Sequence, residues 1–420
     1  MWRHCACKLG VYAGRANGIA AAMENAVIIL LTVAVAALLV YPPIARARLW
    51  RASITPLASI IGSGFLVLGP ILDASYGAYA PLVMAGLCLG AYFFGSAIRF
   101  NIATLDDASC DRSVGARMLE VVASWALAFA YVISVAYYLN LFGAFGLSLT
   151  AFDSPVNARI LTTAVLVLIL VVGWTRGFSA LERMEQISVG IKLSIIAGLI
   201  VGLSFYFVQQ SSAGHLVLNR VTVSGWPAVT LAFGLIVTVQ GFETSRYLGA
   251  NYDARTRIRS MQLAQGVAAA IYMIYIGLLA YVFPQGTLNL SETAIIDMMA
   301  VVAPILPLML VAAALSAQFS AAVADTGGAG GLISELTRFR VSPRQGYVVL
   351  VLVGVGLTWT TDLFQIISYA SRAFAAYYAL QSGIAAISAW SQPQARWKSP
   401  FFAAFAVLGA LIVLFGTAVE

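Results

Sequence analysis

Charged residues are scarce in this 420-residue chain. They make up 10% of it, while hydrophobic residues make up 61%, and an ordinary soluble domain carries roughly 25% charged residues. The scarcity excludes a soluble globule and indicates a chain that lies largely within a membrane. Because apolar runs of membrane-spanning length recur, we expect helical spans rather than barrel strands.

Cysteine and histidine are also rare, with four and two copies in the chain. Four scattered cysteines exclude a disulfide framework. Cys5 and Cys7 stand beside His4, but a structural metal site needs a fuller ligand set, so no metal is expected. The sequence has no phosphate-binding loop, nucleophile elbow or zinc-binding helix motif. These absences argue against an enzyme, a cofactor and ATP-driven transport.

Twelve apolar segments follow one another along the chain. The first, 26–41, is short for a span and is interpreted as an extra helix, with a cleaved signal peptide and a misassigned start site as alternatives. Eleven further spans are predicted at 54–73, 77–103, 116–147, 157–175, 178–208, 226–250, 259–284, 298–336, 345–361, 362–390 and 398–417. No polar stretch between them is long enough for a soluble domain.

Basic residues indicate the orientation of these spans. If the 54–73 span starts in the cytoplasm, 17 of the 24 Lys and Arg residues lie inside, five lie outside, and the remaining two, Lys192 and Arg372, lie within spans. Cytoplasmic loops of membrane proteins carry such an excess. The net charge of +7 is therefore explained by these loops, and no nucleic acid partner is expected.

Two of the spans contain residues that interrupt helices. Gly62, Ser63 and Gly64 lie in the first core span, and glycine inside a helix costs about 1 kcal/mol relative to alanine. Gln240 and Gly241 lie in the 226–250 span. Small residues also allow close helix packing, but the two interruptions are five spans apart, so their helices run in opposite directions. This pattern is typical of secondary transporters built from inverted repeats.

The residues around both interruptions resemble the amino acid–polyamine–organocation (APC) superfamily. Residues 59–67, Ser-Ile-Ile-Gly-Ser-Gly-Phe-Leu-Val, resemble its first-helix signature, and residues 241–243, Gly-Phe-Glu, resemble its sixth-helix signature. The resemblance covers about 54–390. It implies that backbone from the first interruption holds a substrate carboxylate and that carbonyls of the second face an amino group. The implied substrate-binding residues are Ile61, Gly62, Ser63, Gly64, Val239, Gln240, Gly241, Phe242, Glu243 and Tyr131.

The same resemblance implies an all-α polytopic membrane protein with a five-plus-five inverted repeat of the LeuT type. Its first and sixth core helices are expected to be discontinuous. The predicted units are an N-terminal tail and extra helix (1–53), two repeats (54–208 and 226–390) and a peripheral C-terminal span (398–417). The chain departs from common members in its extra N-terminal segment and in having one span, not two, after the core.

Four ionisable residues lie well inside predicted spans: Lys192, Glu243, Asp325 and Arg372. Such residues are costly unless paired or hydrated, so they either form two internal ion pairs or take part in transport. Lys192 resembles a lysine that, in many APC members, stands where sodium-coupled relatives bind sodium, which favours proton coupling or exchange. Asp325 is expected near Lys192.

Ser316 and Ser320 offer the opposite indication. They are four residues apart and share a helix face, the face that sodium-coupled members of the fold use. Arg372 lies in the tenth core span and is predicted to act at the outer gate, by pairing with Glu243 or Asp73 or by binding an anionic substrate. Aromatic residues of the third core span, Tyr131 among them, are candidates for the pocket wall.

Together these features predict a multi-pass secondary active transporter for an amino acid or related amine, in a bacterial inner membrane. Its expected partners are the small-molecule substrate, a proton or sodium ion, and the lipid bilayer. Proton coupling or exchange is favoured. The alternatives are sodium coupling in the same fold and a membrane sensor that binds substrate without transporting it.

Overall fold

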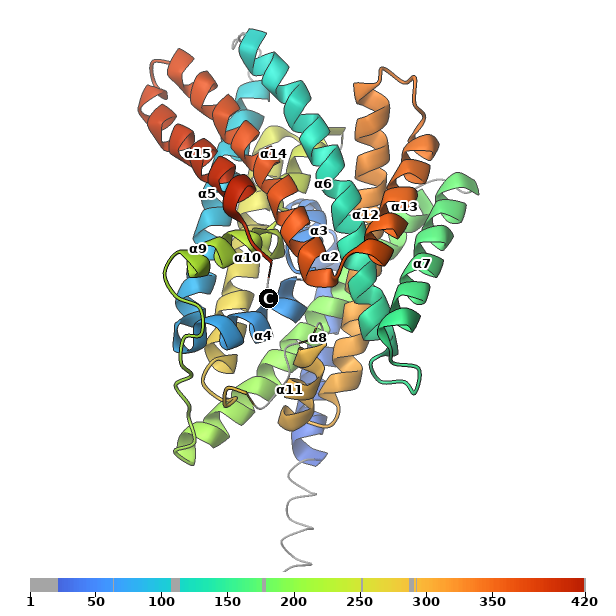
Figure 1. Ribbon diagram of the computed structural model, residues 1–420, viewed down its shortest axis with the longest axis vertical. Coiled ribbons are helices and arrows are strands. Elements are labelled where there is room, and N and C mark those ends of the chain that lie inside the picture. Colours follow the sequence, from blue (N-terminus) through green and yellow to red (C-terminus); the bar gives the residue numbers. More distant parts are fainter. Residues whose placement is uncertain are drawn as a thin grey trace, which may run out of the picture.

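The computed structural model is mostly helical and contains no strand in the part of the chain that it describes, which comprises residues 22–62, 64–106, 114–175, 179–250, 252–286, 291 and 293–418. Figure 1 shows most of its helices running roughly along one direction, as expected for a membrane bundle. The N-terminal His4, Cys5 and Cys7 lie outside the described residues, and so does Ser63.

An N-terminal helix (Ala22–Val40) precedes the labelled elements. The first half of the bundle contains α2 (Pro42–Ala45), α3 (Arg48–Ile60), α4 (Gly64–Tyr76), η1 (Gly77–Tyr79), α5 (Ala80–Asp106), α6 (Val114–Leu147), α7 (Pro155–Thr175) and α8 (Ser179–Ser212). The second half contains α9 (Trp226–Gly234), η2 (Ile236–Val239), η3 (Phe242–Ala250), α10 (Ala254–Leu279), α11 (Ala294–Val302), α12 (Leu306–Leu336), α13 (Pro343–Thr360), α14 (Leu363–Ser391), η4 (Arg396–Lys398) and α15 (Ser399–Phe415).

The predicted interruptions of the first and sixth core helices are confirmed. The first core span is divided into α3 and α4, and the sixth into α9, η2 and η3. The division of the core into two five-span repeats stays a prediction. Eight helical stretches among the described residues are long and apolar enough to cross a membrane, so the chain is an all-α polytopic membrane protein.

One predicted span is wrong at its start. The segment 298–336 is not one helix, because α11 ends at Val302 and α12 begins at Leu306. Pro304 and Pro307 fall at this junction. Proline lacks the backbone N–H that would continue a helix and clashes with the preceding turn, so it is tolerated only within the first turn of α12.

The N-terminal helix packs on the outside of α8. A Cβ added to Gly198 would lie 2.1 Å from Oγ1 of Thr32, and Gly202 lies under the side chain of Ile28. The interior of the bundle is formed mainly by α6, which packs on both α12 and α14, and these three helices meet near the middle of Figure 1.

Candidate functional site

The first break lies between α3 and α4. Helix α3 ends at Ile60, Ile61 leaves helical geometry with φ −87° and ψ 51°, and α4 begins at Gly64. Ile61, Gly62 and Gly64 are all buried. The end of a helix leaves carbonyl groups without intrahelical partners, and the start of one leaves N–H groups. The break therefore presents both kinds of backbone group inside the bundle.

The second break is longer and includes a strained glycine. After α9, the chain forms one short 3-10 turn ending at Val239, and Gln240 is extended with ψ 174°. Gly241 has φ +116°, a conformation open in practice only to glycine. Its N–H donates to Oε2 of Glu243 across 2.9 Å. The chain then continues as the 3-10 helix η3, starting at Phe242.

The two breaks touch each other. A Cβ on Gly64 would lie 2.1 Å from the carbonyl oxygen of Thr238, and a Cβ on Gly241 would lie 2.4 Å from Cβ of Ser59. The hydroxyl of Tyr272 on α10 lies 2.8 Å from the carbonyl oxygen of Ile60 and 2.9 Å from that of Thr238, so it can donate to either. Glycine is required at both crossings because backbone meets backbone there.

Comparison with known proteins shows which family the chain belongs to. The family model for APC superfamily transporters matches residues 42–416. The chain belongs to the APC superfamily of transporters. An uncharacterised protein of Aquifex aeolicus (strain VF5) is 42% identical over 389 residues, which are 90% of this chain and 93% of that protein.

Two buried oxygens at the second break of this APC transporter have no hydrogen-bond partner among the described residues. Glu243 is 0% exposed; its Oε2 accepts from Tyr378 at 2.9 Å as well as from Gly241, but its Oε1 accepts nothing. Gln240 donates through Nε2 to the hydroxyl of Tyr138 at 2.9 Å, and its Oε1 is likewise unpartnered. Such acceptors are costly at membrane depth, so they are suited to a ligand that donates hydrogen bonds.

Aromatic rings enclose these groups. Phe242 stacks on Tyr378 with 5.0 Å between ring centroids. Tyr131 lies on α6 against Phe374, 6.0 Å away between centroids, and against Gly328, where an added Cβ would be 2.9 Å from its ring. The structure therefore brings the predicted Tyr131 and Phe242 into the same aromatic interior around α14.

Lys192 reaches the first break from α8. It is 1% exposed, and its Nζ donates to the carbonyl oxygen of Ala58 in the last turn of α3. A cation there complements the partial negative charge of the helix end. A cavity of about 10 Å³ adjoins it, lined by Gly62, Ile61 and Ala317 among others, which is room for about one water molecule.

The other predicted ion-coupling residues lie on α12. Asp325 is buried and accepts a short hydrogen bond from Oγ of Ser134 on α6. The hydroxyl of Ser320 donates within its own helix, to the carbonyl oxygen of Ala317 at 3.0 Å, and Ser316 is half-buried. The proximity of Asp325 to Lys192 stays a prediction.

The expected pairing of Arg372 with a carboxylate is wrong. Its Nε donates to the carbonyl oxygen of Gly416 at 2.9 Å, and a second nitrogen donates to the same oxygen. Asp73 instead accepts from Nδ2 of Asn219 at 3.0 Å. Arg372 lines a cavity of about 720 Å³ on the side predicted to face outward, and the segment after α15 enters the same cavity at Thr417. Its role at an outer gate stays a prediction.

On the side predicted to be cytoplasmic, polar contacts join η3 to the surrounding helices. Arg246 of η3 donates to Oε1 of Glu120 on α6 at 2.5 Å and also to the side-chain oxygen of Gln381 on α14. Arg48 and Asp253 form a second, exposed pair at 3.0 Å between the starts of α3 and α10. These contacts connect η3 to α6 and α14, and the start of α3 to the start of α10.

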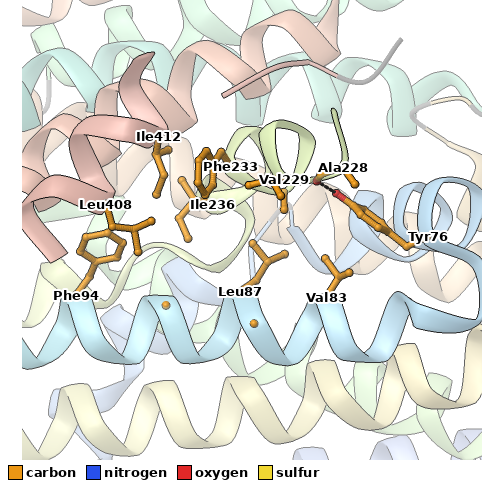
Figure 2. A pocket seen from close by; sticks show the side chains of 13 residues that line it. Tyr76, Val83, Leu87, Phe94, Ala228, Val229, Phe233, Ile236, Leu408 and Ile412 are labelled. Atoms are coloured by element: carbon orange, nitrogen blue, oxygen red, sulfur yellow. Dashed lines mark hydrogen bonds between the residues drawn. The ribbon is translucent and has the colours of Figure 1, made fainter. Parts of the chain in front are cut away.

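A separate groove contains almost no polar groups. It has a volume of about 420 Å³ and lies between α5, α9, η2 and α15. Figure 2 shows Leu87 and Phe94 of α5 along one side of it and Phe233 and Ile412 facing them. The hydroxyl of Tyr76 is turned to the carbonyl oxygen of Ala228 at 2.6 Å, so no donor is left for a polar ligand there.

Sequence reasoning missed several residues of the site. Tyr272 and Tyr378 appear in the sequence as ordinary aromatic residues of apolar spans, and their hydroxyl partners lie far away along the chain. Glu120 lies near the start of a predicted span, and sequence reasoning did not identify it as a residue of the site. The signal in the sequence was a hydroxyl group within an apolar span. That signal does not distinguish a tyrosine of the site from a tyrosine that only packs.

Proposed function

We propose that this APC transporter is a secondary active carrier that moves an amino acid or a related amine by alternating access. The observation that supports this best is the direct contact of two broken helices, which have groups of opposite polarity beside them. Helix α4 begins at the first break, and helix N-termini favour an anionic group such as a carboxylate. The second break offers one oxygen each of Gln240 and Glu243 that has no partner among the described residues, and these oxygens favour an ammonium group.

Proton coupling, or exchange without an ion, is the proposed energy source. Lys192 supports it, because a fixed ammonium already donates to the C-terminal end of α3, where a mobile cation would otherwise bind. The adjoining cavity of about 10 Å³ has little room for a hydrated ion. Ser316 and Ser320 favour the sodium-coupled alternative, since their hydroxyl oxygens are hard ligands, although the Ser320 hydroxyl proton is engaged within α12.

The proposed architecture consists of two inverted repeats, residues 54–208 and 226–390, in a bacterial inner membrane. Polar contacts on the side predicted to be cytoplasmic, such as Arg246 with Glu120, coexist with a cavity of about 720 Å³ on the side predicted to face outward. This asymmetry supports a cycle in which the two sides open in turn. A sensor that binds without transport is the second candidate, and it would share the same site.

Reconstitution into liposomes tests the proposal. The purified protein is expected to accumulate a radiolabelled amino acid or amine under an inward proton gradient, and Lys192→Met is expected to abolish the dependence on protons. Gly62→Leu, which places a side chain toward Tyr138 at the first break, is expected to remove ligand binding altogether.

Each alternative has its own outcome in the same experiment. Accumulation that follows a sodium gradient and survives Lys192→Met would establish the sodium-coupled alternative. Binding without flux under any gradient would favour the sensor. If no member of an amino acid and amine panel stabilises or crosses, the proposed substrate class is refuted.

A further inference from the structure

Gln318 on α12 is a buried amide with no hydrogen-bond partner in the part of the chain that the structure describes. It is 0% exposed, and neither its Oε1 nor its Nε2 has a hydrogen-bond partner among the described residues. Native proteins leave few buried polar groups unpaired, and at membrane depth the free-energy cost is high because bulk water is absent. An unpaired amide with both a donor and an acceptor therefore needs an explanation.

The packing of α12 on α6 places Gln318 beside the site. The two helices run antiparallel: Gly328 lies on Tyr131 and Asp325 bonds Ser134, while Gly146 of α6 approaches Leu315. Gln318 lies between the last two of these contacts. It also precedes Asp325 by seven residues, close to two full helical turns, so both lie on the α6 side of α12.

The same level of α6 holds the groups of the two breaks. Tyr138 lies in the stretch of α6 between Ser134 and Gly146, about one turn after Ser134. Its hydroxyl accepts from Gln240, and its ring lies 3.9 Å from a Cβ placed on Gly62. Ala317, the residue before Gln318, lines the small cavity with Gly62 and Lys192. Gln318 is therefore the sequence neighbour of a residue that lines the first break, on a helix that packs against α6.

We propose that Gln318 is a specificity-determining residue that contacts the substrate side chain. The inference rests on the proposed function. An uncharged amide donates and accepts at once, so it selects a polar uncharged side chain, a hydroxyl or a carboxamide, over an aliphatic one of the same shape. A site with buried polar groups rejects the analogue that leaves them unpaired.

Isosteric ligand pairs and matched variants test this on the purified full chain. The ligands are threonine against valine and asparagine against leucine, measured by thermal stabilisation and by competition for transport. The wild type is expected to prefer threonine and asparagine by at least about tenfold. Gln318→Leu is expected to lose that preference and, without ligand, to melt at a higher temperature than the wild type, because it removes an unpaired amide from an apolar interior.

Gln265 is the matched control. Its amide is fully used, since Oε1 accepts from Arg99 at 2.6 Å and Nε2 donates to the carbonyl oxygen of Ala91 at 2.8 Å. Gln265→Leu is expected to melt at a lower temperature and to keep the preference for threonine. Opposite shifts in melting temperature for the two leucine variants would support a ligand-binding role for Gln318.

Two results would overturn the inference, and they separate it from the proposed function. If the wild type prefers threonine and asparagine but Gln318→Leu keeps that preference and melts earlier, Gln318 is structural and only this inference fails. If none of the four ligands stabilises or competes in the wild type, the amino acid substrate and the role of Gln318 fail together.

Discussion

The contact between the two breaks makes Gly64→Ala the most informative single substitution. The added Cβ would lie 2.1 Å from the carbonyl oxygen of Thr238 and 2.7 Å from its Cα and carbonyl carbon. All three are backbone atoms, so no side-chain rotation relieves the clash. Overpacking a tight interior costs about 1–3 kcal/mol, and we expect the upper end here because Tyr272 also ties the two breaks together.

A cost of about 3 kcal/mol corresponds to roughly a hundredfold change in an equilibrium constant. Gly64→Ala is therefore expected to lower the free energy of unfolding by about 3 kcal/mol, measured by thermal or denaturant unfolding in detergent. Transport in liposomes should also fall, because the substituted break can no longer close against Thr238.

Gly90→Ala on α5 is the control for this substitution. No atom beyond its own helix lies within 4 Å of a Cβ at Gly90, and alanine is favoured over glycine inside a helix by about 0.5–1 kcal/mol. This variant should be slightly more stable than the wild type. If Gly64→Ala proves as stable and as active as Gly90→Ala, the breaks do not meet as described and the site built on their contact is wrong.

Three further predictions concern the surroundings of the site. Tyr272→Phe should lower the free energy of unfolding by about 1–3 kcal/mol, since it deprives two buried carbonyls of their shared donor, and an unchanged unfolding curve would contradict this. Glu120→Gln should lower the free energy of unfolding by about 3–5 kcal/mol, because it removes a charged partner from the buried Arg246. The double variant Glu120→Arg with Arg246→Glu should recover part of this loss, and a double variant without any recovery would argue against the ion pair. The hydroxyls of Thr230 and Thr417 are 3.3 Å apart, so cysteines at both positions should form a disulfide that blocks the outer cavity and transport until a reductant is added, whereas full transport in the oxidised state would place the substrate route elsewhere.

Local chemistry explains why the two breaks were predictable. Gly62 and Gly64 weaken a helix wherever they occur, and Gly241 adopts a backbone conformation that other residues avoid. The effect needs no knowledge of the neighbouring helices. Proline has a comparable local effect at the junction of α11 and α12, where the sequence interpretation overlooked Pro304 and so joined two helices into one.

The partners of the ionisable residues were not predictable in the same way. Lys192 was expected in the membrane interior because of its place in an apolar span, but its contact with Ala58 depends on how α8 crosses α3. Arg372 was expected to pair with Glu243 or Asp73 or to bind an anionic substrate, and the structure gives it a backbone carbonyl at Gly416. The position of a charged residue in a span limits where that residue can lie. It does not select the partner, because many acceptors in other helices can accept its hydrogen bonds.

The sequence by itself determined the membrane environment, the helical class, the broken first and sixth core helices and the family, because hydropathy, helix propensity and short motifs are properties of neighbouring residues. Only the tertiary structure decided that the two breaks touch, that Tyr272 lies between them and that Gln318 is buried with no hydrogen-bond partner in the described part of the chain. Those facts depend on helix rotation and crossing, which are set by packing between segments far apart in the chain. A shift of one residue, about 100° around a helix, would turn Gln318 away from α6 and change the proposed selectivity without altering the hydropathy pattern.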